Sequence, residues 1–177
     1  MTEPSTSARD GVAGGRLPLL VVGIGSELRR DDAIGRHVAA QVAARGVADV
    51  EVLGVHQLTP ELAADLEGRE LVIFVDAAVD VDTVTVRRVS SATASASTHH
   101  LDPAGLLRLA DVLGWTPRRA LAVHVPIHDL RLGTELSPHG RAVAARAVEV
   151  VDFLVATALE ELASRSGGVE VQVSGSA

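Results

Sequence analysis

The stretch LPLLVVGIGSELRRDDAIGRHVAAQVAARG, residues 17–46, decides the fold class of this chain. It begins with a continuous apolar run over residues 17–24, which is typical of a strand buried on both faces of a sheet. The run ends in a Gly-Ile-Gly turn, and a polar loop then leads to Asp31 and Asp32. A helix is predicted over residues 31–45, because apolar side chains recur there every four residues. A strand, a glycine turn and a helix in this order are typical of an open α/β sheet.

The alternation of strands and helices continues along most of the chain. Periodicity and turn residues predict further strands at 50–55, 71–75, 84–89 and 120–125, and helices at 60–66, 103–113 and 140–163. We therefore expect an α/β protein: a three-layer α/β/α sandwich with a mainly parallel, twisted sheet of about five strands. A single domain is expected over residues 16–164, with a disordered tail at 1–15, a mobile loop at 90–98 and a flexible tail at 165–177.

The composition excludes several classes of function. The net charge is −7 and no basic block occurs, so nucleic acids and anionic membranes are not expected as partners. Cysteine, tyrosine and lysine are absent from the sequence, which excludes thiol nucleophiles, disulfides, Schiff bases and Walker lysines. Carboxylates, hydroxyl groups and seven histidines remain for catalysis or for metal binding.

The same composition predicts a cytoplasmic protein. No run of about 18 apolar residues, as a membrane-spanning helix requires, occurs in the sequence. Residues 1–15 are polar and rich in glycine and serine, and they lack the apolar core of a signal peptide. The missing cysteines fit a reducing compartment only weakly.

The glycine turn does not predict a dinucleotide site. Leu28 stands where the third glycine of such a turn would be, and the sequence Gly-Val-His follows the second strand in place of an acid. Asp31 and Asp32 would place negative charge where a pyrophosphate binds. No nucleotide cofactor is expected.

Carboxylates and imidazoles instead follow the predicted buried strands. The first strand leads to Asp31 and Asp32, the second to His56, the third to Asp76, and the loop before the next helix carries His99 and His100. In a parallel sheet these strand ends lie along one edge. Two carboxylates and an imidazole there would suit a divalent first-row metal such as nickel, zinc, manganese or iron.

Each of these residues also has a structural interpretation. We expect Asp31 to be the N-cap of the helix that follows it. Asp32 could complement the dipole of that helix, Asp76 could form a turn, and His99 could be an exposed loop residue. The argument for a site therefore depends on their expected convergence at one edge of the sheet.

Four segments, in this order and spacing, resemble the nickel–iron hydrogenase maturation proteases. They are VVGIGSELRRDDAIG (21–35), LVIFVDAA (71–78), STHHLDPAGLL (97–107) and LGTELSPHGRAVAARAVEVV (132–151). The resemblance covers about residues 17–160. It implies an α/β peptidase domain with endopeptidase activity, a hydrolase that removes a short C-terminal extension from the hydrogenase large-subunit precursor after nickel is loaded.

The resemblance also implies which residues contact nickel. The family pattern places Asp32, Asp76 and His99 as the nickel-binding and catalytic residues. His56 and His100 are further candidate ligands outside that pattern: His56 stands where many relatives have small residues, and His100 is adjacent to His99. The nickel belongs to the substrate, so the protease tests whether metal insertion is complete. The expected partner is the large-subunit precursor, and a monomer is expected.

Some positions depart from the family pattern. Ser26 stands where asparagine is usual, and Asp32 is the shorter of the two acids that occur at its position. Two other functions stay open at the level of sequence. One is a non-catalytic chaperone that holds the nickel-loaded subunit, and the other is an unrelated small metallohydrolase.

Overall fold

A computed structural model describes residues 16–93 and 101–166 of the chain. Its centre is a five-stranded sheet with the order β2-β1-β3-β5-β4. Four strands run parallel, and β4 pairs with β5 in the antiparallel direction. The strand bounds are β1 (Leu19–Ile24), β2 (Val50–Val55), β3 (Leu71–Ala78), β4 (Thr85–Arg88) and β5 (Ala120–Pro126).

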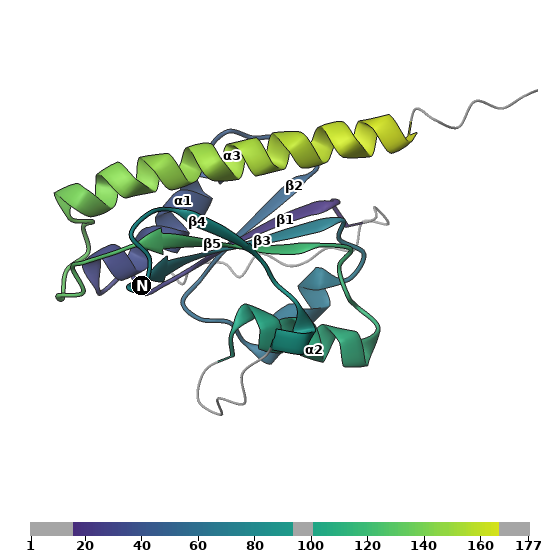
Figure 1. The fold of residues 1–177 in the computed structure, drawn as a ribbon, viewed down its shortest axis with the longest axis horizontal. Coiled ribbons are helices and arrows are strands. Elements are labelled where there is room, and N and C mark those ends of the chain that lie inside the picture. Colours follow the sequence, from purple (N-terminus) through teal and green to yellow (C-terminus); the bar gives the residue numbers. More distant parts are fainter. Residues whose placement is uncertain (1–15, 94–100, 167–177) are drawn as a thin grey trace, which may run out of the picture.

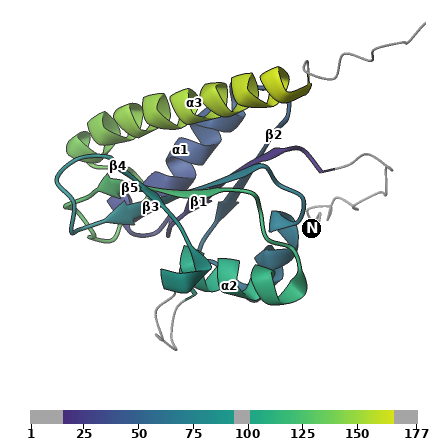
Figure 2. The same cartoon turned by 45° about the vertical axis from the view of Figure 1, so that its right-hand side comes forward.

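Helices cover both faces of the sheet, so the predicted three-layer sandwich is confirmed. The helices α1 (Ile34–Ala43) and α3 (Pro138–Ser166) lie together on one face (Figure 1). On the other face α2 (Pro103–Leu113) packs with the 3₁₀ helix η2 (Pro60–Leu66). Figure 2 shows the sheet between these two layers.

Alternate residues of the central strands supply two separate hydrophobic cores. On β1, Leu19 and Val21 belong to the core beneath α1 and α3, whereas Leu20 and Val22 belong to the core beneath α2. All six residues of β1 are buried, as the continuous apolar run predicted. Each such leucine or valine side chain contributes about 1.5–3 kcal/mol through its removal from water.

The predicted elements agree with the structure where local signals were strong. Strand 50–55 and helix 103–113 have the predicted bounds. The third strand continues to Ala78, because its last residues pair with β5, and Asp76 therefore lies inside the strand. The last helix begins at Pro138 and reaches Ser166, two residues past the predicted domain end at 164.

The short helix predicted at 60–66 is found with these bounds and is a 3₁₀ helix. The start of another predicted helix was wrong. The helix predicted over 31–45 begins only at Ile34, and the 3₁₀ turn η1 (Arg30–Ala33) precedes it. This turn changes the direction of the chain between the end of β1 and the axis of α1. It carries Asp31 and Asp32.

Two glycines allow α1 to lie directly against the sheet. A Cβ atom at Gly35 would overlap the carbonyl oxygens of Ile24 and Val75. A Cβ atom at Gly23 would overlap the carbonyl oxygen of Gly35. Because α1 and β1 touch through backbone atoms, the turn η1 between them has a closely defined position.

Within residues 16–93 and 101–166, no helix is both long and apolar enough to cross a membrane. The tail predicted at 1–15 and residues 167–177 of the tail predicted at 165–177 lie outside the described residues, as do residues 94–98 of the predicted loop. The start of that loop contains the short 3₁₀ turn η3 (Ser91–Thr93).

Candidate functional site

Asp32 lies on η1, just beyond the carboxyl end of β1, and is half-buried. Its Oδ2 atom accepts a hydrogen bond from the backbone N–H of Ser26 over 3.0 Å. Its own backbone N–H donates to the carbonyl oxygen of Arg29 over 2.9 Å. A side chain at Gly25 would overlap the carbonyl group of Asp32, so glycine is required there for the turn to close.

Asp76 lies near the carboxyl end of β3 and is also half-buried. Its Oδ1 atom accepts a hydrogen bond from the backbone N–H of Ala77 over 2.8 Å. Burial raises the pKa of Asp76 to about 6, a rise that the bond from Ala77 opposes and the negative charge of Asp32 increases. A carboxyl group with this pKa gives up or takes a proton close to neutral pH.

The structure brings Asp32 and Asp76 to the same edge of the sheet. Their strands are adjacent and parallel, and the charge of one acid affects the pKa of the other. The expected convergence is therefore found for the two carboxylates. Within the described residues, no group of three potential metal ligands occurs. The third predicted ligand, His99, lies outside those residues, as does His100.

The chain that follows these two histidines returns to the same edge. Leu101 forms an isolated antiparallel bridge with Leu58, which comes three residues after the end of β2. The bridge places the entry to α2 beside the carboxyl end of β2. His56 is exposed on that side, directly after the last residue of β2.

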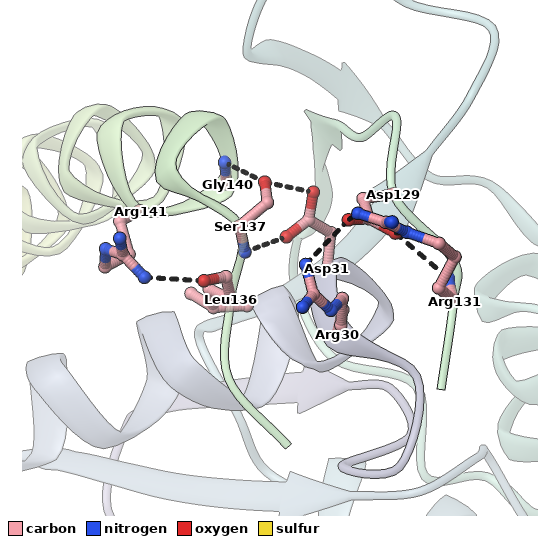
Figure 3. A network of polar contacts seen from close by, with 8 residues as sticks. All are labelled: Arg30, Asp31, Asp129, Arg131, Leu136, Ser137, Gly140 and Arg141. Atoms are coloured by element: carbon pink, nitrogen blue, oxygen red, sulfur yellow. Dashed lines mark hydrogen bonds and ion pairs between the residues drawn. The ribbon is translucent and has the colours of Figure 1, made fainter. Parts of the chain in front are cut away.

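Asp31 does not have the predicted role. The N-cap positions of η1 and α1 are occupied by Arg29 and Ala33. Asp31 is fully buried, and its side chain contacts the start of α3 instead (Figure 3). Oδ1 accepts from the backbone N–H of Ser137 over 2.7 Å, and Oδ2 accepts from the Ser137 hydroxyl over 2.8 Å. The prediction failed because Ser137 comes 106 residues later in the chain.

Sequence reasoning also missed the ion pairs around Asp129. Arg30 on η1 contacts the Asp129 carboxylate over 2.9 Å, and Arg131 contacts it over 2.7 Å. The hydrogen bond from Arg131 and the proximity of Arg30 hold the pKa of Asp129 well below its usual range. A Ser-Pro pair before a long helix is a recognisable N-cap signal for Ser137, whereas Asp129 has no such signal in the sequence.

A cavity of about 780 Å³ opens beside this edge, between α1, β2 and residues 134–136. Leu28, Arg36, Gly54 and Leu136 are among its lining residues. Asp32 and Asp76 do not line it. The cavity is therefore a neighbouring hollow on the α1 side of the sheet, and the pair of acids defines the candidate site.

Comparison with known proteins points to one group of solved structures. Neither a protein-family model nor a curated protein sequence matches the chain. The hydrogenase maturating endopeptidase HybD from E. coli superposes with a TM-score of 0.63 at 28% identity, covering 75% of this chain and 88% of HybD. An endopeptidase from Escherichia coli, solved in solution, gives 0.61 and 28%, with coverage of 86% and 94%.

A third structure supports the fold alone, because its sequence is more distant. The [NiFe] hydrogenase maturation protease HycI from Thermococcus kodakarensis superposes with a TM-score of 0.61 at 21% identity. The match covers 77% of this chain and 91% of HycI. The family resemblance seen in the four sequence segments is thus confirmed by structures that share this fold.

Proposed function

We propose that the chain is a maturation protease like the endopeptidases that share its fold at 28% identity, and that it acts on a [NiFe]-hydrogenase large-subunit precursor. It removes the C-terminal extension of the precursor once nickel has been inserted. The observation that carries this proposal is the pair of half-buried acids, Asp32 and Asp76, at the carboxyl edge of a sheet shared with HybD.

The substrate's nickel is the feature that the site recognises. Two carboxylates at one edge repel each other and gain from a cation placed between them. With His99, whose segment leads into Leu101 at the same edge, they provide two oxygen ligands and one nitrogen ligand for a metal that the precursor already holds. Ligands of this kind, without thiolates, bind free nickel weakly, so nickel alone is a poor substitute for the loaded precursor.

Peptide hydrolysis needs a base and a water molecule. Asp76, with a pKa of about 6, is mostly ionised at neutral pH and can take a proton from water. The hydroxide equivalent attacks the scissile carbonyl carbon, the C–N bond breaks, and the proton passes to the leaving amine. The substrate's nickel would either polarise the carbonyl group or position the peptide.

The direct test mixes the protein with nickel-loaded precursor and records intact mass over time. The expected result is the loss of a C-terminal fragment from loaded precursor and an unchanged mass for nickel-free precursor. An unchanged mass with a stable complex would support the chaperone interpretation instead. Cleavage of unrelated peptides by protein that carries its own metal would support the metallohydrolase interpretation.

Substitutions then test the site. Asp32→Ala, Asp76→Ala and His99→Ala should each abolish processing while the circular dichroism spectrum stays that of the folded protein. Glu160→Ala, at an exposed acid on a late turn of α3, is the control and should process normally. Processing that survives all three site substitutions would show that these residues do not form the active site.

A further inference from the structure

We propose that Asp31 is a positioning residue: its buried carboxylate holds η1 against the first turn of α3 and thereby sets the position of Asp32. The Asp31 side chain points towards Ser137, which donates hydrogen bonds to both of its carboxylate oxygens (Figure 3). The consequence for processing rests on the proposed function. The structural part of the inference does not.

Both oxygens of the Asp31 carboxylate are used. Ser137 donates its backbone N–H to one oxygen and its hydroxyl to the other, over 2.7 and 2.8 Å. The same hydroxyl oxygen accepts the backbone N–H of Gly140 over 2.9 Å, which is the hydrogen bond of an N-cap. Asp31 thus orients the residue that caps α3, a helix of 29 residues. The positive end of that helix favours a negative charge beside it.

An acid is needed at this position because both Ser137 groups are donors. A carboxylate offers two acceptor oxygens, whereas an asparagine amide would turn a donor towards one of them. The fit is also close. A Cβ atom at Gly140 would overlap the Asp31 carboxylate, so the helix approaches the acid through its backbone.

A second set of contacts holds the same turn from the segment before α3. The backbone N–H of Asp31 donates to the carbonyl oxygen of Asp129, and that of Arg30 donates to Gly133, over 3.2 and 2.9 Å. Arg30 has a φ of 40°, in the left-handed region that costs a non-glycine residue energy. Such a conformation persists where surrounding contacts hold it, and here the Arg30–Asp129 ion pair and the Asp31–Ser137 contact do so.

Asp32 follows Asp31 directly in this turn, so its position depends on these contacts. Its carboxylate reports that position through its hydrogen bond from the Ser26 N–H, 3.0 Å long. If η1 moves relative to β1, this bond lengthens and the distance between Asp32 and Asp76 changes. The Ser26 amide is therefore a reporter of the Asp32 position that does not depend on activity.

The experiment compares four variants with the wild-type protein. Asp31→Asn and Ser137→Ala each remove one of the two hydrogen bonds between these residues, and Ser137→Thr keeps the hydroxyl. Val155→Ala removes buried side-chain volume from a later turn of α3 and is the control for lost stability alone. Amide NMR spectra of the free proteins give the shift of the Ser26 N–H. Processing of loaded precursor, per folded molecule, gives kcat/KM.

We expect Asp31→Asn and Ser137→Ala to shift the Ser26 amide proton upfield and to lower kcat/KM about tenfold or more. Ser137→Thr should restore both, and Val155→Ala should change neither. An unchanged Ser26 amide in folded Asp31→Asn and Ser137→Ala would overturn the inference. A shifted amide in a protein whose wild type does not process precursor would support the positioning role and count against the proposed function.

Discussion

The buried Arg69 and the half-buried Asp76 lie at opposite ends of the same sheet, and the groups around them have opposite effects on their charges. At the amino end, Arg69 donates to the carbonyl oxygens of Asp65 and Leu17 over 2.9 and 2.5 Å, and pairs with the carboxylate of Glu51. At the carboxyl end, Asp76 accepts a hydrogen bond from Ala77 and has the acid Asp32 as its neighbour. The positive charge of Arg69 is thus surrounded by acceptors and a carboxylate, whereas the negative charge of Asp76 has another negative charge beside it.

The difference separates a structural charge from a functional one. A buried charge that is paired and hydrogen-bonded contributes to holding the fold together, and its removal leaves its partners unsatisfied. A buried charge beside a like charge costs stability, so a role in binding or catalysis is the usual reason for finding it. We therefore expect substitution of Asp76 to lower activity without lowering stability, and substitution of Arg69 to lower stability without lowering activity.

The largest effect is expected for Asp76→Asn. Processing should fall about a thousandfold, or about 4 kcal/mol in activation free energy, because the proposed base and metal ligand is lost. The free energy of unfolding at neutral pH should rise, since a desolvated charge becomes a neutral amide. Timed mass spectrometry and urea denaturation measure the two effects. A variant that loses both activity and stability would contradict the comparison, and Glu160→Gln is the exposed control.

Arg69→Met should have the reverse effect. The free energy of unfolding should fall by about 3 kcal/mol, because the substitution leaves buried carbonyl groups and Glu51 without their donor. Processing per folded molecule should stay within about twofold of the wild type. The control is Arg118→Met: its side chain is 62% exposed and its ion pair with Glu70 is 3.6 Å long, so the expected loss is below about 1 kcal/mol.

The pH dependence of the free energy of unfolding should show directly that the charge of Asp76 costs stability. The folded pKa of Asp76, about 6, lies above its ordinary value of 3.8, so between these values the folded state binds more protons than the unfolded state. Stability therefore falls as pH rises through this range, by about 1–3 kcal/mol. Urea denaturation at a series of pH values should show this loss in the wild type and its absence in Asp76→Asn. If the free energy of unfolding changed with pH in the same way in the wild type and in Asp76→Asn, the raised pKa of Asp76 would be refuted.

The smallest effect is expected at His56. This histidine is exposed after β2, and its substitution by alanine should change processing less than about threefold. His99→Ala, assayed beside it, should abolish processing. A strong loss of processing in His56→Ala would add this residue to the site. The site would then extend along the carboxyl edge of the sheet to β2.

The sequence predicted what local chemistry determines. Helix 103–113 has Asp102 as its N-cap, proline at its first position and Gly114 in the left-handed conformation at its end, and all three signals are adjacent to the helix. The apolar runs likewise predicted the buried strands. Asp32 and Asp76 were expected at one edge because they lie beyond or near the carboxyl ends of neighbouring parallel strands, where topology brings residues together.

Contacts between distant parts of the chain were not predictable in this way. Asp31 was assigned to its own helix because a cap is the common role of an aspartate at that position. Its actual partner, Ser137, becomes adjacent only when α3 lies across the sheet. Arg69 gave no signal either, since Glu51 and the carbonyl group of Leu17 meet it only through the pairing of β1, β2 and β3.

The close contact of Gly23 with Gly35 limits how proteins with this architecture can diversify. Because α1 rests on the strand through backbone atoms, the turn cannot be moved outward or inward by changing the size of a side chain between them. The reach of the acid can then change only through its own length. At position 32, aspartate in place of glutamate shortens that reach by one methylene group. If the proposed function holds, the substitution Asp32→Glu would therefore measure how far from the turn the precursor's metal binds.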